Sequence, residues 1–487
     1  MRPVFRVGMA ALVLMLMPAV AAANADEYAA RRAELARQLG PDAMLILISP
    51  PAAQRNGDVD WPFRQEDSLL YLTGQNEPET SLVLLPGEPG HKEILFTRDS
   101  NPAQEVWNGR IPTPDEVART TGVKEVVSST RFKGFLQAAM EGRGWGDARS
   151  SRAGTAGLMA WRDRVRAGKG LVWLIMENRA LGGDLSAERK LVEELRRSYP
   201  ELQFRDAFPL LAGMRMIKSP AEIATVQRAI DITVAAQKAA MQRVRTAKHE
   251  YEIHATIDYT FRNLGACCWA FPSIAASGRN ATTLHYGSNN DPIPPGSLML
   301  TDIGAEVDGY SADVTRTYPQ DGTFSPEQRD IYEAVLRTQT ATIAMMKPGV
   351  SFRDVGDAAS KLLGDELLKL GLVTRNERAQ VSMFFLHGLG HELGLRTHDV
   401  TDRGRKLEAG RIVTNEPGLY VRPVDVRANP VFQTLAAAEK AGIEAALLKY
   451  ADIGVRIEDD ILITDGEPKN LSAAAPRTVE EIESFMK

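Results

Sequence analysis

The stretch TDIGAEVDGYSADVT, from Thr301 to Thr315, predicts a β-hairpin that brings two aspartates together. An apolar run precedes it, and Asp308-Gly309 is a strong signal for a two-residue hairpin loop. Such a loop pairs Asp302 with Thr315 and makes Asp313 a diagonal neighbour of Asp302 on the same face. Two carboxylates in this arrangement repel each other unless a cation lies between them. Solvated aspartates on an exposed hairpin are the alternative.

A second acidic segment is GVRIEDD, Gly454 to Asp460, which is followed by the apolar run ILI. Strand alternation places Arg456, Glu458 and Asp460 on one face. A carboxylate amid an apolar strand needs a partner, because burying it unpaired is costly.

A third segment is TNEPGLY, Thr414 to Tyr420. Glu416 is expected to end a strand there, and Pro417-Gly418 to turn the chain. Taken alone, Glu416 is best explained as a helix N-cap or turn residue.

Three of the seven histidines fall in HGLGHELGLRTHD, His387 to Asp399. His391-Glu392 resembles the start of a HExxH zinc helix, but Leu395 stands where the second histidine would be. Three glycines argue against a regular helix and predict close approach of the backbone to another group. One histidine with four carboxylates would form an oxygen-rich site suited to Mn, Co or Zn. Two such ions can generate a hydroxide and polarise a carbonyl together.

After the first 25 residues, the chain divides into two α/β domains. Residues 26–212 alternate short apolar runs with helical stretches. The expected strands are Ala43–Ile48, Ser81–Leu85, Glu93–Phe96 and Leu171–Ile175, and a helix is expected from Lys190 to Tyr199. In the second domain, residues 213–487, Ser219, Pro220 and Glu222 form the signature of a helix N-terminus. Nearly all the candidate chemistry lies in this second domain.

Residues 1–25 have the basic, apolar and small-residue order of a signal peptide, with an uncleaved anchor as the alternative. We therefore expect an exported protein, periplasmic or secreted, with no membrane span in the mature chain. The net charge of -5 gives no basis for nucleic-acid binding. Cys267 and Cys268 are adjacent, so they predict neither a disulfide framework nor a cysteine-based zinc site, but two partly buried thiols.

The acidic and histidine segments together match a known family. Asp302, Asp313, His391, Glu416 and Glu458 stand in the order and local contexts of the dinuclear-metal peptidases with the pita-bread fold. HGLGHELGLRTHDV resembles the signature shared by aminopeptidase P and prolidase. FRQEDSLLYLTGQNEPE, residues 63–79, resembles their N-terminal domain. The resemblance covers roughly residues 35–487. It implies an N-terminal creatinase/aminopeptidase-P-type α/β domain and a C-terminal pita-bread catalytic domain.

The resemblance also implies a ligand set for two divalent metal ions, with Mn preferred and Co or Zn as alternatives. Asp302 and Asp313 would bind one ion, with Asp313 bridging, and His391 would complete the ligands of the second ion. Glu416 and Glu458 would supply the remaining carboxylates, with Glu458 bridging.

Other residues acquire roles from the same resemblance. Glu416 would also be the proton shuttle, while His285 and His398 would bind substrate and stabilise the tetrahedral intermediate. His387 would line the proline-side pocket, and Arg456 would orient a ligand carboxylate. The glycines of the histidine segment would allow close approach to the substrate. The remaining histidines, His91, His249 and His254, are expected on the surface or in packing.

Three activities remain open. The preferred activity is that of an exopeptidase that releases the first residue from Xaa-Pro-peptides, which LYLTGQNEPE favours. The stretch from Tyr420 to Gly454 and the ending APRTVEEIESFM favour a dipeptidase. Arg403 and Arg405 could then bind the free carboxylate, although ordinary surface arginines are the commoner explanation. A metal-free binding module is the remote third, disfavoured because all five ligands are present. The expected partners are proline-containing peptides and further copies of the chain, in a dimer or tetramer.

Overall fold

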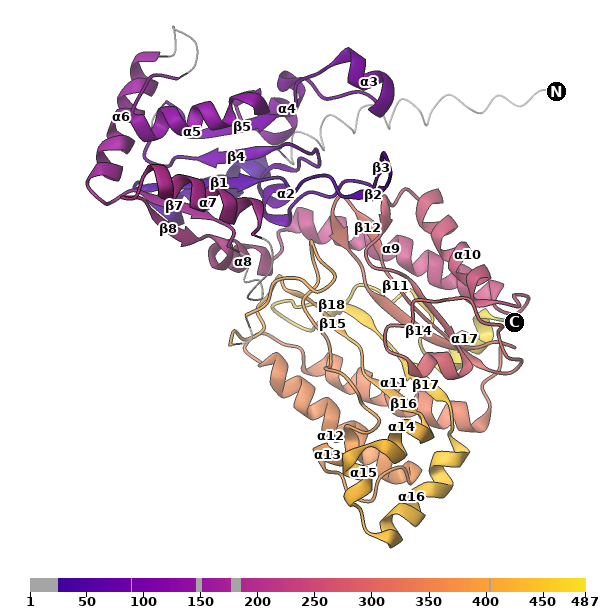
Figure 1. Ribbon diagram of the computed structural model, residues 1–487. Helices are drawn as coiled ribbons and strands as arrows, with labels where there is room; N and C mark the ends of the chain where they lie inside the picture. The colour runs from indigo at the N-terminus through magenta and orange to yellow at the C-terminus, as the bar shows by residue number, and fades with distance from the viewer. Residues whose placement is uncertain (1–24, 89, 146–150, 177–184, 403) are drawn as a thin grey trace, which may run out of the picture. The chain divides into compact units, whose positions relative to one another are not determined.

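The computed structural model describes residues 25–487 apart from residues 89, 146–150, 177–184 and 403, and the chain divides into two units between Met214 and Arg215 (Figure 1). The boundary expected from the sequence lies between residues 212 and 213. Of the expected signal peptide, residues 1–24 lie outside the described residues. Among the helices that are described, none has both the length and the apolar character needed to cross a bilayer.

The N-terminal unit is built on a mixed six-stranded sheet in the order β6-β5-β4-β1-β7-β8. Its strands are β1 (Ala43–Ile48), β4 (Ser81–Leu84), β5 (Glu93–Thr97), β6 (Glu125–Ser128), β7 (Leu171–Leu174) and β8 (Gln203–Asp206). β1 pairs antiparallel with β4 and parallel with β7. The four strands expected from apolar runs are present. The two edge strands, β6 and β8, were not predicted because their residues are only partly buried and lack an apolar run.

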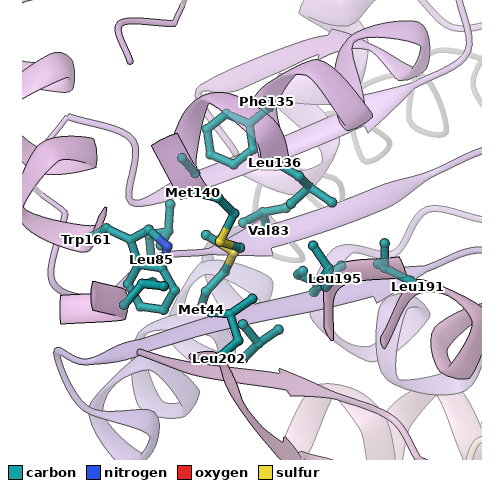
Figure 2. Packing of buried hydrophobic residues seen from close by; sticks show 14 of the residues in the cluster. Met44, Val83, Leu85, Phe135, Leu136, Met140, Trp161, Leu191, Leu195 and Leu202 are labelled. Atoms are coloured by element: carbon teal, nitrogen blue, oxygen red, sulfur yellow. The ribbon is translucent and has the colours of Figure 1, made fainter. Parts of the chain in front are cut away.

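One face of this sheet is covered by α5 (Phe132–Glu141), α6 (Ser151–Arg166) and α7 (Ala187–Ser198), as Figure 2 shows for part of the core. Phe135, Trp161 and Leu195 from the three helices pack against Met44 and Val83 of the strands. Fully burying a large apolar side chain contributes roughly 1.5–3 kcal/mol, so this cluster accounts for much of the unit's stability. The unit also contains a helix over residues 25–39, α2 (Asp67–Thr73), α3 (Pro102–Asn108), α4 (Pro114–Thr121), α8 (Phe208–Met216) and the β2–β3 hairpin (Gln54–Asn56, Val59–Asp60).

The C-terminal unit opens with the helix expected from its capping signature, α9 (Pro220–Arg243). The Ser219 hydroxyl accepts a hydrogen bond from the amide of Glu222, and the Glu222 carboxylate accepts one from the amide of Ser219. α10 (Glu250–Asn263) packs beside α9, and α9 covers the strands of the predicted hairpin (Figure 1).

The hairpin has the predicted register. One side of the hairpin is formed by β11 (Leu298–Ile303) and β12 (Ala305–Val307), and the other by β13 (Tyr310–Ser311) and β14 (Val314–Pro319). Val307 lies opposite Tyr310, and Asp302 lies opposite Thr315. Asp308 and Gly309 both have positive φ, 50° and 82°, as a type I′ turn requires. β10 (Ile274–Ser277) extends the sheet beside β11, and β9 (Cys268–Trp269) pairs with β12.

The second half of this unit repeats the combination of long helices and strand pairs. α11 (Pro326–Met345) packs against α12 (Phe352–Leu370) and against strands β15 (Ile412–Asn415), β16 (Gly418–Val421) and β17 (Ile453–Arg456). β18 (Asp459–Leu462) completes the β15 pair. The unit also contains α13 (Arg378–Val381), α14 (Pro423–Ala428), α15 (Pro430–Thr434), α16 (Ala437–Lys449), α17 (Val479–Phe485) and β19 (Lys469–Asn470).

The single strand expected over residues 454–460 is wrong in one respect, because the chain forms two strands. β17 pairs with β16 and β18 pairs with β15, so the chain changes partner at Ile457-Glu458. The facing chain changes partner at Glu416-Pro417, between β15 and β16. Glu416 and Glu458 therefore both lie at interruptions of the strand ladders.

Candidate active site

A cavity of about 1000 Å³ in the C-terminal unit contains every site residue expected from the sequence. These are His285, Asp302, Asp313, His387, His391, His398, Glu416, Arg456 and Glu458. They come from five separate segments of the chain, so the fold of the unit assembles the cluster. The other three histidines do not line this cavity. His91 is buried in the N-terminal unit, His249 stacks on Tyr251, and His254 lies 3.6 Å from Asp258.

The acidic residues are positioned by strands and strand interruptions. Asp302 lies near the end of β11 and Asp313 immediately before β14, on facing chains of the hairpin. Glu458 follows β17, and its amide donates to the carbonyl oxygen of Thr315 at 3.1 Å. Glu416 follows β15, and its amide donates to the carbonyl oxygen of Leu389 at 2.8 Å.

His391 lies in the irregular segment that the glycines predicted, and it is fixed by the strand that precedes Glu416. Its amide donates to Oγ1 of Thr414 at 3.0 Å, and its carbonyl oxygen accepts from the amide of Thr414 at 2.8 Å. Nε2 of His391 lies 3.5 Å from Oδ2 of Asp313 and 3.4 Å from Oε1 of Glu416. The imidazole is thus directed at the carboxylates.

Several oxygens of this cluster have no hydrogen-bond partner among the described residues. They are Oδ1 of Asp302, Oδ1 of Asp313 and Oε1 of Glu458, all buried. One ligand atom each from Asp313, His391 and Glu458 lies within 4.8 Å of the others. Leaving buried carboxylate oxygens without partners is costly, and a bound cation would satisfy them together.

The electrostatics of the cluster favour the same conclusion. Burial raises the pKa of Asp313 well above its ordinary value, and the neighbouring Glu458 and Asp302 carboxylates add to the shift. Burial, followed by the Glu416 and Asp302 charges, does the same to the pKa of Glu458. Burial also raises the pKa of Glu416 to about 8, against the opposing charge of Arg456. These groups ionise together only if a cation offsets their burial and repulsion.

His391 is suited to complete such a site. Burial lowers its pKa to about 4, with His398 contributing, so the ring is neutral at physiological pH. Neutral imidazole is the form that binds a metal ion. Nδ1 of His391 lies 3.0 Å from the carbonyl oxygen of Glu392, which leaves Nε2 facing the carboxylates. Oxygen atoms and one imidazole form a donor set that fits a divalent metal such as Mn, Co or Zn.

Arg456 connects the acidic cluster to residues that the sequence did not single out. Its guanidinium donates to Oδ2 of Asp302 at 2.5 Å, to the Tyr420 hydroxyl at 2.9 Å and to Oγ1 of Thr315 at 3.2 Å. Oγ1 of Thr315 donates to Oε2 of Glu458 at 2.7 Å. Tyr420 lies in the same short segment as Glu416, but only the change of strand partner at Glu416-Pro417 directs its hydroxyl to Arg456.

The other histidines of the cavity surround this cluster. Nε2 of His387 lies 2.7 Å from the Tyr420 hydroxyl, and burial lowers the pKa of His387 to about 4. The rings of His391 and His398 have centroids 4.0 Å apart. Burial lowers the pKa of His398 as well, with the neighbouring His285 contributing.

One buried carboxylate, that of Glu250 at the start of α10, fixes the loop that carries His285. The hydroxyl of Tyr286, the residue after His285, donates to Oε2 of Glu250 at 2.7 Å. Glu250 also accepts from Ser277, Asn280 and the amide of Asp291, at 2.8 to 3.0 Å. The sequence did not predict this arrangement, because Glu250 is far from His285 along the chain.

The glycines of the histidine segment allow close approach, but in two cases to the protein itself. A Cβ on Gly390 would lie 2.3 Å from the carbonyl oxygen of Thr414, and one on Gly394 would lie 2.2 Å from Oδ2 of Asp399. Gly390 also lines the cavity, so the expectation that these glycines admit the substrate stays a prediction. Gly388 lines the cavity and has no atom within 4 Å of its Cβ position, so it stays compatible with substrate approach.

Comparisons with known proteins cover both units of the chain. The family model for the N-terminal domain of aminopeptidase P matches residues 28–145, and the model for metallopeptidase family M24 matches residues 224–465. An Xaa-Pro aminopeptidase of Haemophilus influenzae is 34% identical over 470 residues, covering 95% of this chain and 97% of that protein.

Solved structures of similar proteins span the same length. A putative aminopeptidase P from Bacillus anthracis matches with a TM-score of 0.80 and 30% identity, covering 95% of this chain and 98% of that one. Aminopeptidase P from Escherichia coli with the inhibitor Pro-Leu matches with a TM-score of 0.77 and 30% identity, with 95% and 98% covered. Both domains and nearly the whole length are thus matched, and this chain belongs to the aminopeptidase P family of M24 metallopeptidases.

Proposed function

We propose that this protein is an Xaa-Pro aminopeptidase, which releases the N-terminal residue from peptides that have proline in second position. The observation that carries the proposal is the cavity itself. It combines a carboxylate cluster, in which three buried oxygens have no hydrogen-bond partner among the described residues, with an imidazole directed at it and three further histidines, in a chain of the aminopeptidase P family.

We propose that two divalent ions are held by the carboxylates and imidazole at the centre of the cavity, namely Asp302, Asp313, His391, Glu416 and Glu458. The unpartnered oxygens and the raised pKa values of Asp313 and Glu458 support this assignment. Mn is the preferred metal because most donors are hard oxygens, and Co and Zn suit the same set. When bound, such ions supply a water of lowered pKa and polarise the scissile carbonyl.

Glu416 is proposed as the residue that moves the proton. Proline is a secondary amine, so its nitrogen must gain a proton to leave as a free N-terminus. Oε1 of Glu416 lies 3.4 Å from Nε2 of His391, at the centre of the proposed ligand set. A carboxylate in this position can accept a proton from a bound water and return it to the leaving nitrogen.

The remaining cavity residues are proposed to bind and orient the substrate. His285 and His398 would stabilise the negative charge that develops on the carbonyl oxygen. His387, fixed by the Tyr420 hydroxyl, would line the pocket for the proline ring. Arg456 would hold Asp302 in position and so act through it on the reaction.

Comparing three peptides on Mn-loaded protein tests the proposal. We expect release of the first residue from Xaa-Pro-Yaa, little from Xaa-Ala-Yaa, and little from the dipeptide Xaa-Pro. Cleavage of the dipeptide alone would contradict the proposal in favour of a dipeptidase. Failure to bind any divalent ion would instead support a metal-free binding module. A Glu416→Gln variant, with the metal content of each sample measured, separates loss of the proton carrier from loss of metal.

We also propose that the protein is exported and works as a dimer or tetramer. The basic, apolar and small-residue order of residues 1–25 supports export. N-terminal sequencing of protein from the extracytoplasmic fraction is expected to begin after this segment, and light scattering gives the subunit count. An intact N-terminus in the cytoplasmic fraction would contradict export.

A further inference from the structure

A second group of metal-ligating side chains lies outside the cluster described above. Cys268 begins β9 and is paired with Glu306 of β12, and Cys267 precedes it. The amide of Cys267 donates to the carbonyl oxygen of Glu306 at 3.1 Å, and its Sγ lies 3.6 Å from Oε1 of Glu306. The carboxylate is buried, while Cys267 is exposed and Cys268 half-buried.

The thiol groups of Cys267 and Cys268 lie close together, although the side chains of adjacent residues on a strand ordinarily point apart. Successive side chains along a strand point to opposite faces of the sheet. Here Cys267 lies before the first residue of β9, so strand alternation does not constrain its side chain. Both Sγ atoms and one carboxylate oxygen of Glu306 lie within 4.8 Å of one another.

We propose that Cys267, Cys268 and Glu306 form a binding site for one thiophilic divalent cation, such as Zn²⁺ or Cd²⁺. Two thiolates and a carboxylate are ligands that Zn²⁺ accepts, and a water can take the fourth position on the exposed side. Each thiol releases its proton to solvent when it binds the ion. Adjacent cysteines alone predicted no zinc site, because Glu306 is 39 positions away from Cys267 along the chain.

This site differs in chemistry from the oxygen-rich cluster, although one chain segment joins them. β9 runs into Ala270, whose amide donates to the carbonyl oxygen of Gly304 at 2.7 Å, and Ala270 and Phe271 line the cavity. β12 follows directly from the strand that carries Asp302. An ion that joins β9 to β12 would therefore stabilise one wall of the cavity without contacting the substrate.

The chain has only two cysteines, which makes the site separately observable. Absorption from thiolate-to-cadmium charge transfer can arise only here, whatever ions the carboxylates hold. We expect reduced, Mn-loaded, full-length protein to develop this band on titration with Cd²⁺ and to saturate at one equivalent per chain. A large excess of Zn²⁺ should diminish the band by competing for the same thiolates, and Cd²⁺ should raise the melting temperature.

Substitutions locate the ligands. Cys268→Ser is expected to abolish the band. Glu306→Gln is expected to weaken Cd²⁺ binding at least tenfold, and Glu480→Gln, at an exposed glutamate, is the matched control that should leave it unchanged. Circular dichroism checks that each variant keeps its fold.

Three results would overturn the proposal. One is the absence of the band at one equivalent of Cd²⁺. Another is unchanged affinity in a folded Glu306→Gln variant, and the third is saturation at one ion per two chains. These results are independent of the peptidase activity, so they leave the proposed function to its own test.

Discussion

Nη2 of Arg456 lies 2.5 Å from Oδ2 of Asp302, and both side chains are buried beneath the cavity. The same guanidinium also donates to the Tyr420 hydroxyl and to Oγ1 of Thr315, which in turn donates to Glu458. One guanidinium group therefore orients two carboxylates of the acidic cluster, Asp302 directly and Glu458 through Thr315. The planar fork of arginine makes this possible, because lysine offers a single point charge.

Replacing this residue with lysine tests the arrangement. Arg456→Lys is expected to keep a positive charge but to lose at least one of the three contacts, and so to lower kcat/KM about 10- to 100-fold, as changes behind metal ligands typically do. The measurement is kcat/KM on Xaa-Pro-Yaa together with metal content. Arg378→Lys, at an exposed arginine, is the control and should change neither. An Arg456→Lys variant with normal activity and metal content would contradict the positioning role.

The sequence predicted the hairpin and its register because the two-residue loop at Asp308-Gly309 fixes the pairing from one end. Side-chain alternation then located Asp302 and Asp313 without any long-range information. Side-chain alternation could not predict that the strand is interrupted at Ile457-Glu458, because the interruption arises where the chain changes from one partner strand to another.

The same limit explains the residues that were missed. Tyr420 contributes to the site through Arg456 and His387, which are far away in the sequence. Glu250 contributes through the loop that carries His285, which is also distant from it along the chain. Local patterns do not encode such contacts. The edge strands of the N-terminal unit were missed for a different reason, because partly buried strands lack a continuous apolar run.

Glu250 is expected to support catalysis through the loop that it holds. In Glu250→Gln one acceptor oxygen is replaced by a donor that faces other donors, so the free energy of unfolding should fall by about 1–3 kcal/mol. Displacement of His285 should lower kcat while the metal content stays normal. Tyr286→Phe removes only the hydroxyl that donates to Glu250 and accepts from Asn280, and it should have a smaller effect on both quantities. Equal kcat in all three proteins would show that the loop is positioned without Glu250.

Two glycines of the histidine segment should respond differently to the same change. Gly390→Ala puts a methyl group against the backbone of Thr414 and should destabilise the protein by about 1–3 kcal/mol, as overpacking does. In Gly388→Ala the added methyl group points into open space. The unfolding free energy of this variant should therefore stay unchanged, while its KM for the peptide rises. Chemical denaturation and steady-state kinetics give the two quantities. The reverse pattern would contradict the assignment of Gly390 to packing.

The carboxylate cluster has a consequence for the protein without its metal. Burial and mutual repulsion raise the pKa values of Asp313 and Glu458, and that of Glu416 rises from 4.5 to about 8. Above pH 4.5 the unfolded chain releases these protons while the folded chain retains them. The unfolded state then binds fewer protons, so the free energy of unfolding falls as the pH increases.

The buried histidines His387 and His391 oppose this trend at lower pH, because their pKa values fall from 6.5 to about 4 and the unfolded chain binds more protons than the folded chain there. Chelator-treated protein is therefore expected to lose stability mainly between about pH 6.5, above which these histidines are neutral in both states, and about pH 8, the pKa of Glu416. Asp313→Asn removes one of the repelling charges, so the metal-free variant should show a shallower decline and exceed the wild type at pH 8. With Mn present the order should reverse, because the variant lacks a ligand that links metal binding to folding. Asp308→Asn, in the exposed hairpin turn, is the matched control and should leave both curves unchanged. Denaturation midpoints measured across this range decide the matter. Metal-free stability that increases between about pH 6.5 and pH 8 would mean that charges of the protein already balance these carboxylates, and that no cation is needed to hold them together.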